Sequence, residues 1–575
     1  MQVILDIEAD SLTPTLIHCI VVKELTTGEV KSFVQRQCYT EFPKYAEGVT
    51  KFIGHNIISF DIPAINRLLG LSIGLGRLED TLILSQLMNP VRDGGHSLEA
   101  WGNTLRFPKI DFNDFSCFTP QMLEYCKQDV ELTHRVWLTL SREVEKLSSK
   151  HCVQLEYKVR ELVNEQQKNG FTLDIPKAMM LVARLRDKSA AVEKQVHETF
   201  LPLAVSIKEV TPRYTKNGSL SSVGLNHLDL HTVCVEGPHT AIEWPEFNLA
   251  SRQQIVRHLM LRGWKPQKFT EKGNPIVDED VLETVTIPEA QLIKEYLLLQ
   301  KRIAQIDSWL ELVQDDGKVH GNVLTIGAIS TRMAHSSPNM AQVPASRNPY
   351  GKECRECWTV SDPDFVLLGC DASSLELRGL AHYLGDSKFT TEVVSGDIHT
   401  ANQKAAGLQT RDQAKTFIYA FIYGAGPAKI GLIVGGSAKD GQRLIDQFLA
   451  NVPAINTLRK RIDMASKRGY LIGLDGRKLM IRSAHAAVNQ LIQGAGAVIC
   501  KQWLVEIDKL KHEHNIRAKL VASIHDEYQF EVHKDDAQRF GELTKLAMKE
   551  TEKVLKVKCP LDSEFRPGKT WAETH

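Results

Sequence analysis

The chain has 575 residues, which is too long for a single hydrophobic core and predicts roughly two to four domains. Its 70 basic and 70 acidic residues cancel, so net charge neither indicates nor excludes a nucleic-acid partner. No apolar run reaches the roughly 18 residues of a membrane span, and the first residues, MQVILDIEAD, lack the pattern of a signal peptide.

Residues 1–150 alternate short apolar strands with helical patterns. Strands are predicted for VILDIEAD and CIVVKEL, and a helix is predicted for QMLEYCKQDVELTHRVWLTLSREVEKL. This alternation predicts an α/β unit at the start of the chain.

Long helices are predicted after residue 151. The first covers LEYKVRELVNEQQK and stops at Asn169-Gly170, a second follows Pro176, and a third covers AQLIKEYLLLQKRIAQIDSWLELV. Between the second and third helices, residues 201–246 are rich in Pro, Gly, Thr and His and predict a loop or a small β insertion. After residue 318 the pattern mixes strands and helices again.

Two acidic residues lie two positions apart on the first predicted strand. Asp6 and Glu8 therefore point to the same face, opposite Val3, Leu5 and Ile7. Like charges held this close raise one pKa unless a cation lies between them. A solvated strand face explains the pair equally well at this point.

Two further segments supply carboxylates. Asp61 stands inside FIGHNIISFDIPAI, and Tyr125 and Asp129 lie four apart on one helix face, although singly Asp61 fits a cap and Asp129 a surface acid. With Asp6 and Glu8 they form an oxygen-ligand set suited to Mg²⁺ or Mn²⁺, and two such ions support phosphodiester hydrolysis with Tyr125 orienting the water. The order D-x-E, then D, then Y-x-x-x-D resembles the DEDD-class 3′–5′ proofreading exonucleases of the tyrosine subtype.

A second pair of carboxylates is predicted in the C-terminal half. The apolar segment FVLL leads into Asp371, which is costly to bury unless it caps the next helix or holds a metal. Its candidate partner is Asp526 in LVASIHDEYQFEV, residues 520–532, which predicts two strands meeting in a turn. A turn aspartate is common for its own sake. Two strands that each deliver one aspartate can also share a pair of Mg²⁺ ions for phosphoryl transfer.

A basic helix face is predicted within residues 410–426. Arg411, Lys415 and Tyr419 fall at i, i+4 and i+8, and Tyr423 extends the stripe. Two cations followed by an aromatic side chain suit a triphosphate and its base, and His399 is a further candidate phosphate contact. An amphipathic helix with a solvated basic edge is the alternative.

These three blocks are strongly similar to motifs A, B and C of the family A DNA polymerases, and the nearest resemblance is to the replicative polymerases of the T-seven-like phages. The resemblance covers nearly the whole chain and includes STRMAHSSPNMAQVPASRNPYG, GLDGRKLMIRSAHAAVNQLIQGAGAVICK and HSLEAWG. It implies an α/β fold with an RNase H-like exonuclease domain at 1–148 and a right-hand polymerase domain at 149–575. The implied subdomains are a thumb at about 149–318, a palm at about 319–384 and 471–575, and fingers at about 385–470.

The resemblance also implies a role for each matching residue. Asp371 and Asp526 bind the two catalytic metal ions, and Arg411 and Lys415 hold the β- and γ-phosphates of the incoming nucleotide. Lys415 also protonates the leaving pyrophosphate. The metal ions implied at both sites are Mg²⁺, two per site, with Mn²⁺ able to substitute.

Further implied contacts concern the sugar, the template and the primer. Glu376 blocks a ribose 2′-hydroxyl, Tyr419 lies against the sugar, and Tyr423 stacks near the template base. Because a tyrosine hydroxyl can replace a missing 3′-hydroxyl, Tyr419 predicts ready incorporation of dideoxynucleotides. The implied DNA contacts are Arg332, Asn489 and Gln493 in the minor groove and His525 at the primer terminus.

The implied function is template-directed DNA synthesis for phage genome replication, with 3′–5′ proofreading, in the host bacterial cytoplasm. The implied partners are primer–template DNA, deoxynucleoside triphosphates, a phage helicase-primase and a single-strand binding protein. T-seven-like relatives carry a larger basic thumb insertion that recruits host thioredoxin. Here the region at about 201–246 is shorter, and its only Lys and Arg residues are Lys208, Arg213 and Lys216. The sequence therefore argues against thioredoxin dependence and leaves two alternatives: no processivity factor, or a different clamp.

Three alternatives differ in what they leave unexplained. A dedicated exonuclease that only grips DNA with its C-terminal region makes Asp371 and Asp526 structural and gives Lys415 no role. A non-catalytic primer–template binding module makes both carboxylate sets inert. A host repair polymerase is disfavoured because the chain starts directly in the first exonuclease strand, without a 5′-nuclease domain ahead of it. Metal-dependent primer extension separates the first two from a polymerase.

Overall fold

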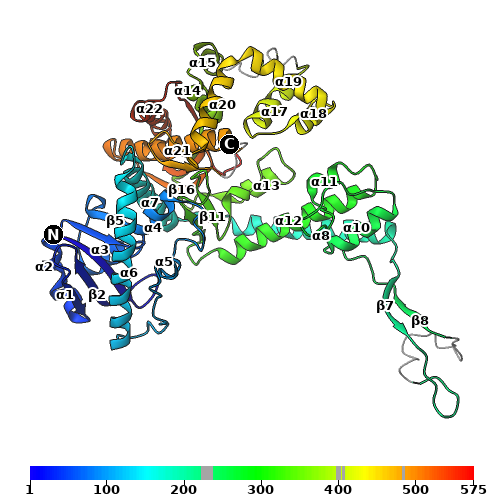
Figure 1. The fold of residues 1–575 in the computed structure, drawn as a ribbon, viewed down its shortest axis with the longest axis horizontal. Coiled ribbons are helices and arrows are strands. Elements are labelled where there is room, and N and C mark those ends of the chain that lie inside the picture. The colour runs from blue at the N-terminus through cyan, green and yellow to red at the C-terminus, as the bar shows by residue number, and fades with distance from the viewer. Residues whose placement is uncertain (222–236, 396–399, 401–402, 404–407, 482–485) are drawn as a thin grey trace. The chain divides into compact units, whose positions relative to one another are not determined.

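The computed structural model describes residues 1–221, 237–395, 400, 403, 408–481 and 486–575. These residues form two compact units (Figure 1). The first unit joins Met1–Leu173 to Val313–His575, and the second is Asp174–Leu312. Among the described residues, no helix is long and apolar enough to cross a membrane.

A mixed five-stranded sheet forms the N-terminal part of the first unit. Its order is β3-β2-β1-β4-β5, with β1 antiparallel to β2 and parallel to β4. The strands are β1 (Gln2–Ala9), β2 (Ile17–Glu24), β3 (Val30–Val34), β4 (Lys51–Gly54) and β5 (Leu78–Asp80). The helices are α1 (Arg36–Thr40), α2 (Phe42–Glu47), α3 (Asp61–Leu69), α4 (Thr81–Met88), α5 (Leu98–Leu105) and α6 (Pro120–Glu145).

The two faces of β1 enter different cores. Val3, Leu5 and Ile7 pack into the larger cluster of the N-terminal part, while Ile4 packs with Cys126 of α6 in a smaller one. Strand alternation therefore turns Asp6 and Glu8 towards α6, because they share the face of Ile4. The predicted separation of the apolar and acidic faces of this strand is confirmed.

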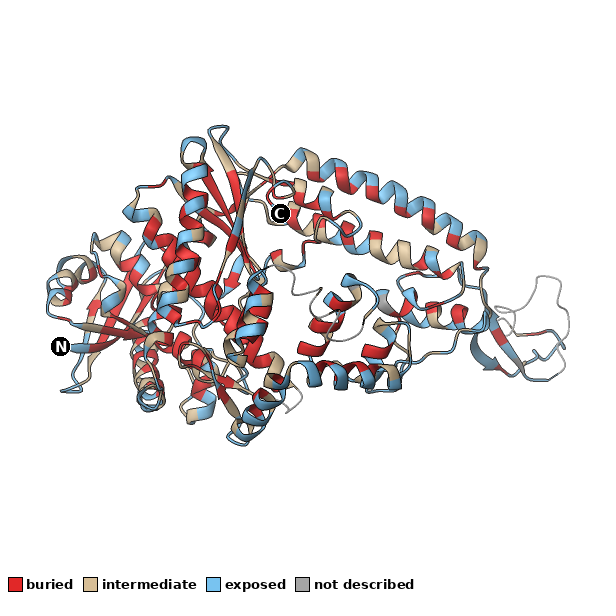
Figure 2. Ribbon diagram, turned by 90° about the horizontal axis from the view of Figure 1, so that it is seen from above, coloured by how far each residue is buried: buried red, intermediate tan, exposed pale blue. Residues whose placement is uncertain are grey.

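An antiparallel four-stranded sheet forms the second core of this unit. Its order is β16-β17-β13-β18. The strands are β13 (Phe365–Ala372), β16 (Ala518–Ile524), β17 (Glu527–His533) and β18 (Ser563–Gly568). Two long helices support the sheet: α22 (Ala537–Leu555) packs on three of its strands, and α21 (Ala487–Glu513) packs on α22. Buried residues concentrate where helices meet the sheets (Figure 2).

The remaining elements complete the first unit. The helices are α7 (His151–Asn169), α13 (Gly351–Glu356), α14 (Leu375–Leu384), α15 (Ser387–Val394), α17 (Arg411–Ile422), α18 (Pro427–Ile433), α19 (Ala438–Asn451) and α20 (Pro453–Ser466). The strands are β6 (Phe171–Leu173), β9 (Lys318–Val319), β10 (Asn322–Leu324), β11 (Ala334–Ser336), β12 (Trp358–Thr359), β14 (Tyr470–Ile472) and β15 (Lys478–Met480). Helix α7 ends at Asn169, and the next residue, Gly170, has a positive φ of 64°, which favours glycine.

The second unit is built on two long helices that pack together, α8 (Ile175–Thr199) and α12 (Ala290–Leu312). It also contains β7 (Val205–Val210), β8 (His239–Glu243), α10 (Arg252–Leu261) and α11 (Glu279–Glu283). Strands β7 and β8 form an antiparallel ribbon that extends away from the helices of this unit (Figure 1). The predicted insertion at residues 201–246 therefore contains β structure, with residues 222–236 outside the described part. The predicted domain and subdomain boundaries stay predictions.

Candidate active sites

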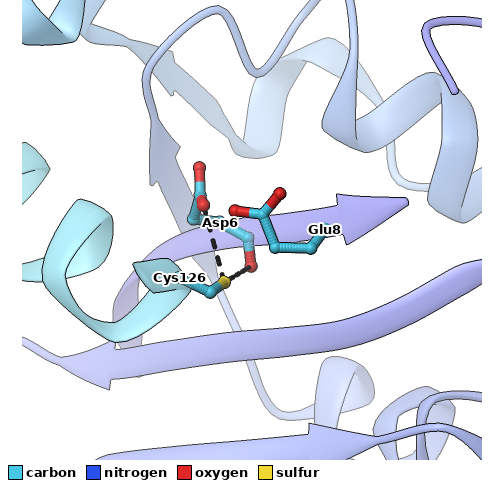
Figure 3. Close-up of side chains that lie close together, drawn as sticks. All are labelled: Asp6, Glu8 and Cys126. Carbon is cyan, nitrogen blue, oxygen red and sulfur yellow. Dashed lines mark hydrogen bonds between the residues drawn. The ribbon is translucent and has the colours of Figure 1, made fainter. Parts of the chain in front are cut away.

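The first centre lies at the acidic face of β1. Asp61, the first residue of α3, comes next to this strand because its Oδ1 accepts a hydrogen bond of 3.2 Å from the backbone N–H of Ile7. Glu8 is 7% exposed and Asp61 3% exposed, so a solvated strand face and a surface helix cap are both excluded. Asp6 and Glu8 gather beside Cys126 (Figure 3), with ligand atoms within 4.8 Å of one another.

Helix α6 closes the centre from the other side. Asp129 is buried, and its Oδ2 lies 2.5 Å from the ammonium of Lys109. The same ammonium donates a hydrogen bond of 2.7 Å to the hydroxyl of Tyr125, one turn earlier on the helix. The structure therefore joins Tyr125 and Asp129 through one lysine, as two residues on one helix face allow.

The acidic groups of this centre resist ionisation. Burial raises the pKa of Glu8 to about 9, helped by Cys19 and Asp129, and burial raises the pKa of Asp61 to about 7. The pKa of Asp6 is raised well above its usual value by burial and then by Glu8, Asp129 and Asp61. Burial also raises the pKa of Asp129, although Lys109 opposes this.

The donor set fits a hard divalent cation. The ligand atoms of Asp6 and Glu8 lie close together, and Asp61 and Asp129 are near enough to raise the pKa of Asp6. Oδ1 of Asp129 is buried without a hydrogen-bond partner among the described residues. Carboxylate oxygens are the ligands that Mg²⁺ and Mn²⁺ prefer. A cation among these groups would lower the pKa values that burial and mutual repulsion raise, and it could be bound by the unsatisfied Asp129 oxygen.

Two members of this centre were missed by the sequence analysis. Lys109 follows Pro108 in an irregular segment, where no periodicity indicates its direction. Cys126 lies on the predicted helix one position after Tyr125, and its thiol donates weak hydrogen bonds of 3.5 Å to the backbone oxygen and to Oδ2 of Asp6 (Figure 3). Its position was predictable, but its contact with β1 depends on tertiary packing.

The second centre lies where β13 and the β16–β17 turn meet. The backbone N–H of Ala372, next to Asp371, donates a hydrogen bond of 3.0 Å to the backbone oxygen of Asp526. Burial raises the pKa of Asp371 to about 7, with Asp526 and Glu527 adding to the shift, and burial raises the pKa of Asp526. The predicted pair of strands that meet in a turn is confirmed as β16 and β17, and Asp526 lies in the turn between them. Asp371 lies within β13 and does not cap the following helix, whose N-cap is Ser374.

Beside this centre, Glu376 links two other side chains through one carboxylate oxygen. Its Oε1 lies 3.0 Å from Nη2 of Arg332 and accepts a hydrogen bond of 2.6 Å from the hydroxyl of Tyr423. Burial, together with Glu376 and Asp526, raises the pKa of Tyr419 to about 12. The structure therefore brings Arg332, Glu376, Tyr419 and Tyr423 to the aspartate pair.

Helix α17 carries the predicted basic face. Thr410 caps it with a complete capping box, in which Thr410 accepts from the N–H of Gln413 and the Gln413 side chain accepts from the N–H of Thr410. Arg411 and Lys415 are exposed and form no ion pair with the residues that the structure describes. The candidate phosphate contact His399 lies outside the described residues.

The remaining predicted DNA contacts are on α21 and at the β16–β17 turn. Asn489 and Gln493 lie four apart on α21, hence on one face, and Oδ1 of Asn489 is buried without a hydrogen-bond partner among the described residues. His525 occupies the turn with a φ of 56°, and burial together with Arg332 lowers its pKa. Arg332 and His525 line the same cavity of about 20 Å³.

Comparisons with known proteins agree with this geometry. The model of DNA polymerase family A matches residues 232–573. The chain is 33% identical to the DNA-directed DNA polymerase of Enterobacteria phage T3, over 99% of each chain, and 33% identical to that of Escherichia phage T7, over 100% of each chain. Its fold matches the POL domain of Pol1 from M. smegmatis in complex with DNA primer-template and dNTP, with a TM-score of 0.80, 17% identity, and coverage of 100% of this chain and 96% of that one. The chain belongs to the family A DNA polymerases, and it is a DNA-directed DNA polymerase of the T7-like phage type.

Proposed function

We propose that this polymerase synthesises DNA at the centre of Asp371 and Asp526 and proofreads at the centre of Asp6, Glu8 and Asp129. The observation that carries the proposal is the presence of two separate sets of buried or half-buried carboxylates with raised pKa values. Each set combines hard oxygen ligands with a neighbouring tyrosine. Clusters of this kind are typical of sites that bind divalent metal ions and transfer phosphoryl groups.

At the polymerase centre, Asp371 and Asp526 hold two Mg²⁺ ions, for which Mn²⁺ can substitute. Arg411 and Lys415 bind the β- and γ-phosphates, since both side chains are exposed and free of ion pairs with described residues. Lys415 then donates a proton to the leaving pyrophosphate. At both centres, divalent ions held by these carboxylates would lower the pKa of the attacking hydroxyl or water and would neutralise charge on the leaving group.

Selection of the nucleotide falls to the chain of hydrogen bonds around Glu376. Its carboxylate occupies the place where a ribose 2′-hydroxyl would need room, and its bonds to Arg332 and Tyr423 hold it there. Tyr419 lies against the sugar and presents its hydroxyl where the 3′-hydroxyl belongs. Tyr423, which is 44% exposed at the end of α17, is the candidate for stacking near the template base.

At the exonuclease centre, Asp6, Glu8, Asp61 and Asp129 hold two metal ions. Tyr125 orients the attacking water. Lys109 supports this role because its ammonium donates to the Tyr125 oxygen, which leaves the phenolic hydrogen available to another acceptor.

The primer–template duplex is bound by Arg332, Asn489, Gln493 and His525. Asn489 and Gln493 support this assignment because they lie four apart on α21 and therefore share one face of the helix.

The protein partners follow from the replicative role. We expect a phage helicase-primase and a single-strand binding protein at the fork, in the host cytoplasm. We do not expect host thioredoxin to act as a clamp, because the region at about 201–246 holds only three basic residues. An affinity titration with host thioredoxin tests this, and nanomolar binding would contradict it.

Separation of the two activities tests the proposal. A labelled primer–template is incubated with Mg²⁺, with and without deoxynucleotides, for wild type, Asp371→Ala and Asp6→Ala/Glu8→Ala. We expect Asp371→Ala to lose extension and keep trimming, and the double variant to do the reverse. The matched controls are Asp364→Ala and Glu29→Ala, which remove exposed acids close to each centre in sequence. Loss of both activities in either active-site variant would contradict the assignment of two independent centres.

A further inference from the structure

A fully buried ionic cluster lies beneath the segment that carries Arg332. We call it the Glu156 cluster and define it as Glu156 of α7, Asp475 and Arg477 of the β14–β15 turn, and Lys501 of α21. Their exposed fractions are 0%, 4%, 0% and 1%. Two acids and two bases make the cluster neutral as a whole.

The internal contacts of the Glu156 cluster are short. Oε1 of Glu156 lies 2.6 Å from Nζ of Lys501 and 2.7 Å from Nη1 of Arg477, and Nη2 of Arg477 lies 2.7 Å from Oδ2 of Asp475. Burying four charges rarely stabilises a protein more than a well-packed apolar core would. Net stabilisation of the fold therefore does not explain why these four charges are buried together.

The cluster directs its remaining donors to one residue, Thr331. Lys501 donates a hydrogen bond of 2.9 Å to the backbone oxygen of Thr331, and Arg477 donates one of 2.8 Å to its hydroxyl. Thr331 has a φ of 60°, a left-handed conformation that is strongly disfavoured for a β-branched residue. Two bonds from a rigid, buried cluster can hold a backbone conformation that the chain would not adopt by itself.

Arg332 follows Thr331 directly, so the conformation of Thr331 sets the direction of the next side chain. Its guanidinium reaches Glu376, which also binds Tyr423. Lys501, Arg332 and His525 line one cavity of about 20 Å³, which places the cluster directly behind the proposed DNA-contacting residues. Relaxation of Thr331 to a right-handed or extended conformation would turn Arg332 away from Glu376.

We propose that the Glu156 cluster positions Arg332 by locking Thr331 in the left-handed conformation, and that it thereby makes nucleotide addition depend on a correctly paired primer terminus. The four residues are positioning residues, since they touch neither DNA nor nucleotide. This inference rests on the proposed contact between Arg332 and the minor groove. A correctly placed Arg332 contacts a matched primer terminus but not a mismatched one. Loss of this positioning therefore lowers the rate of nucleotide addition on matched primers more than on mismatched primers.

The test compares two charge-balanced double variants of the full-length polymerase. Glu156→Gln/Lys501→Met removes one acid and one base, leaves the Arg477–Asp475 pair, and deletes the bond to the Thr331 oxygen. Lys158→Met/Asp508→Asn is the matched control: it breaks an ion pair of 3.1 Å between the same two helices, α7 and α21, that does not involve Thr331. The measurement is kcat/KM for the next correct nucleotide on matched and mismatched primers.

We expect the cluster variant to lower kcat/KM on matched primers by about 10-fold or more and to reduce the matched-to-mismatched ratio by a similar factor. The control keeps the wild-type ratio. Adding Arg332→Ala to the cluster variant changes the ratio no further than Arg332→Ala alone does, because both act through one contact. A purely structural role of the cluster predicts an unchanged matched-to-mismatched ratio. It also predicts that the effects of the cluster variant and of Arg332→Ala add. Either result would overturn the inference.

A third variant keeps the test decisive if the cluster variant does not fold. Thr331→Gly tolerates the left-handed conformation but loses the hydroxyl that Arg477 binds and gains freedom to leave that conformation. It is expected to lower the matched-to-mismatched ratio in the same direction, and an unchanged ratio would overturn the inference. If Arg332→Ala itself leaves the ratio unchanged, the proposed DNA contact of Arg332 fails. If Arg332→Ala lowers the ratio but the cluster and Thr331 variants keep the wild-type ratio, the contact of Arg332 stands and only the positioning role of the cluster fails.

Discussion

The two carboxylate centres of this polymerase differ in where their positive charge stands. The proposed exonuclease centre has an ammonium of its own, because Lys109 contacts both Asp129 and Tyr125. The proposed polymerase centre has Asp371 on β13 and Asp526 in the β16–β17 turn, while its proposed phosphate-binding cations lie exposed on α17 without ion pairs to described residues. One centre is largely assembled by the fold, and the other leaves its cations free for a ligand.

This difference matches the substrates proposed for each centre. A single phosphodiester brings one negative charge, so an exonuclease centre gains little from free lysines and arginines. A deoxynucleoside triphosphate brings a polyanion that exposed cations can bind without first breaking an ion pair. Exposed cations without ion pairs therefore indicate the substrate of a centre as clearly as its acidic residues do.

The largest expected effect concerns Lys415, the proposed proton donor. Lys415→Ala is expected to lower kcat of extension by about 1,000-fold, because general acid catalysis and phosphate binding are both lost. Trimming is expected to stay at the wild-type rate. Lys429→Ala, an exposed lysine on α18, is the matched control. Single-turnover rates measure both activities, and a loss below 10-fold would remove Lys415 from the mechanism.

The next largest effect concerns Tyr419 at the proposed polymerase centre. Tyr419→Phe is expected to reduce dideoxynucleotide incorporation by about 10- to 100-fold while leaving deoxynucleotide incorporation almost unchanged, because one hydrogen bond near the sugar is lost. Competition between the two nucleotides on one primer gives the ratio. Equal discrimination by wild type and variant would contradict this role.

Substitution of Lys109 tests the proposed exonuclease centre. Lys109→Ala is expected to slow trimming by about 10- to 100-fold, because Tyr125 and Asp129 lose their common partner, and to leave extension unchanged. Lys109→Arg restores part of the rate by keeping the charge. Lys127→Ala removes an exposed lysine of α6 that pairs with Glu124, and it serves as the control. Trimming at the wild-type rate in Lys109→Ala would show that the lysine is incidental.

The smallest effect is on stability in the presence of a chelator. With EDTA, the free energy of unfolding is expected to fall by about 1 to 3 kcal/mol as pH rises from about 5 to about 9. The pKa of Glu8 is raised to about 9 and that of Asp61 to about 7, so the folded chain holds protons that the unfolded chain has released above about pH 4. Excess Mg²⁺ replaces these protons and flattens the dependence. Thermal midpoints measure it, and a midpoint that rises with pH would contradict the assigned pKa directions.

Periodicity along single elements was predictable from the sequence. The alternation in β1 placed Asp6 and Glu8 on one face, and helical spacing placed Arg411, Lys415 and Tyr419 together on α17. These patterns depend only on the repeat of a strand or a helix. The family resemblance supplied what periodicity cannot, namely that Asp371 and Asp526 meet.

Contacts between distant elements were not predictable in this way. Lys109 lies in an irregular segment, and the Glu156 cluster joins residues from α7, α21 and a turn. Their meeting depends on how helices pack against the two sheets, which no spacing along the chain encodes. The left-handed conformation of Thr331 was equally hidden, because its cause lies in side chains more than a hundred residues away in sequence.

Binding of Mn²⁺ tests the central comparison most directly. Free Mn²⁺ is titrated by electron paramagnetic resonance against wild type, Asp6→Asn/Glu8→Gln and Asp371→Asn, without nucleotide and then with a nonhydrolysable deoxynucleotide and primer–template. We expect the tighter nucleotide-free binding to disappear in Asp6→Asn/Glu8→Gln and to persist in Asp371→Asn. We also expect the binding gained with nucleotide to disappear in Asp371→Asn. Nucleotide-free binding that is lost in Asp371→Asn and kept in Asp6→Asn/Glu8→Gln would contradict the proposed difference between the two centres.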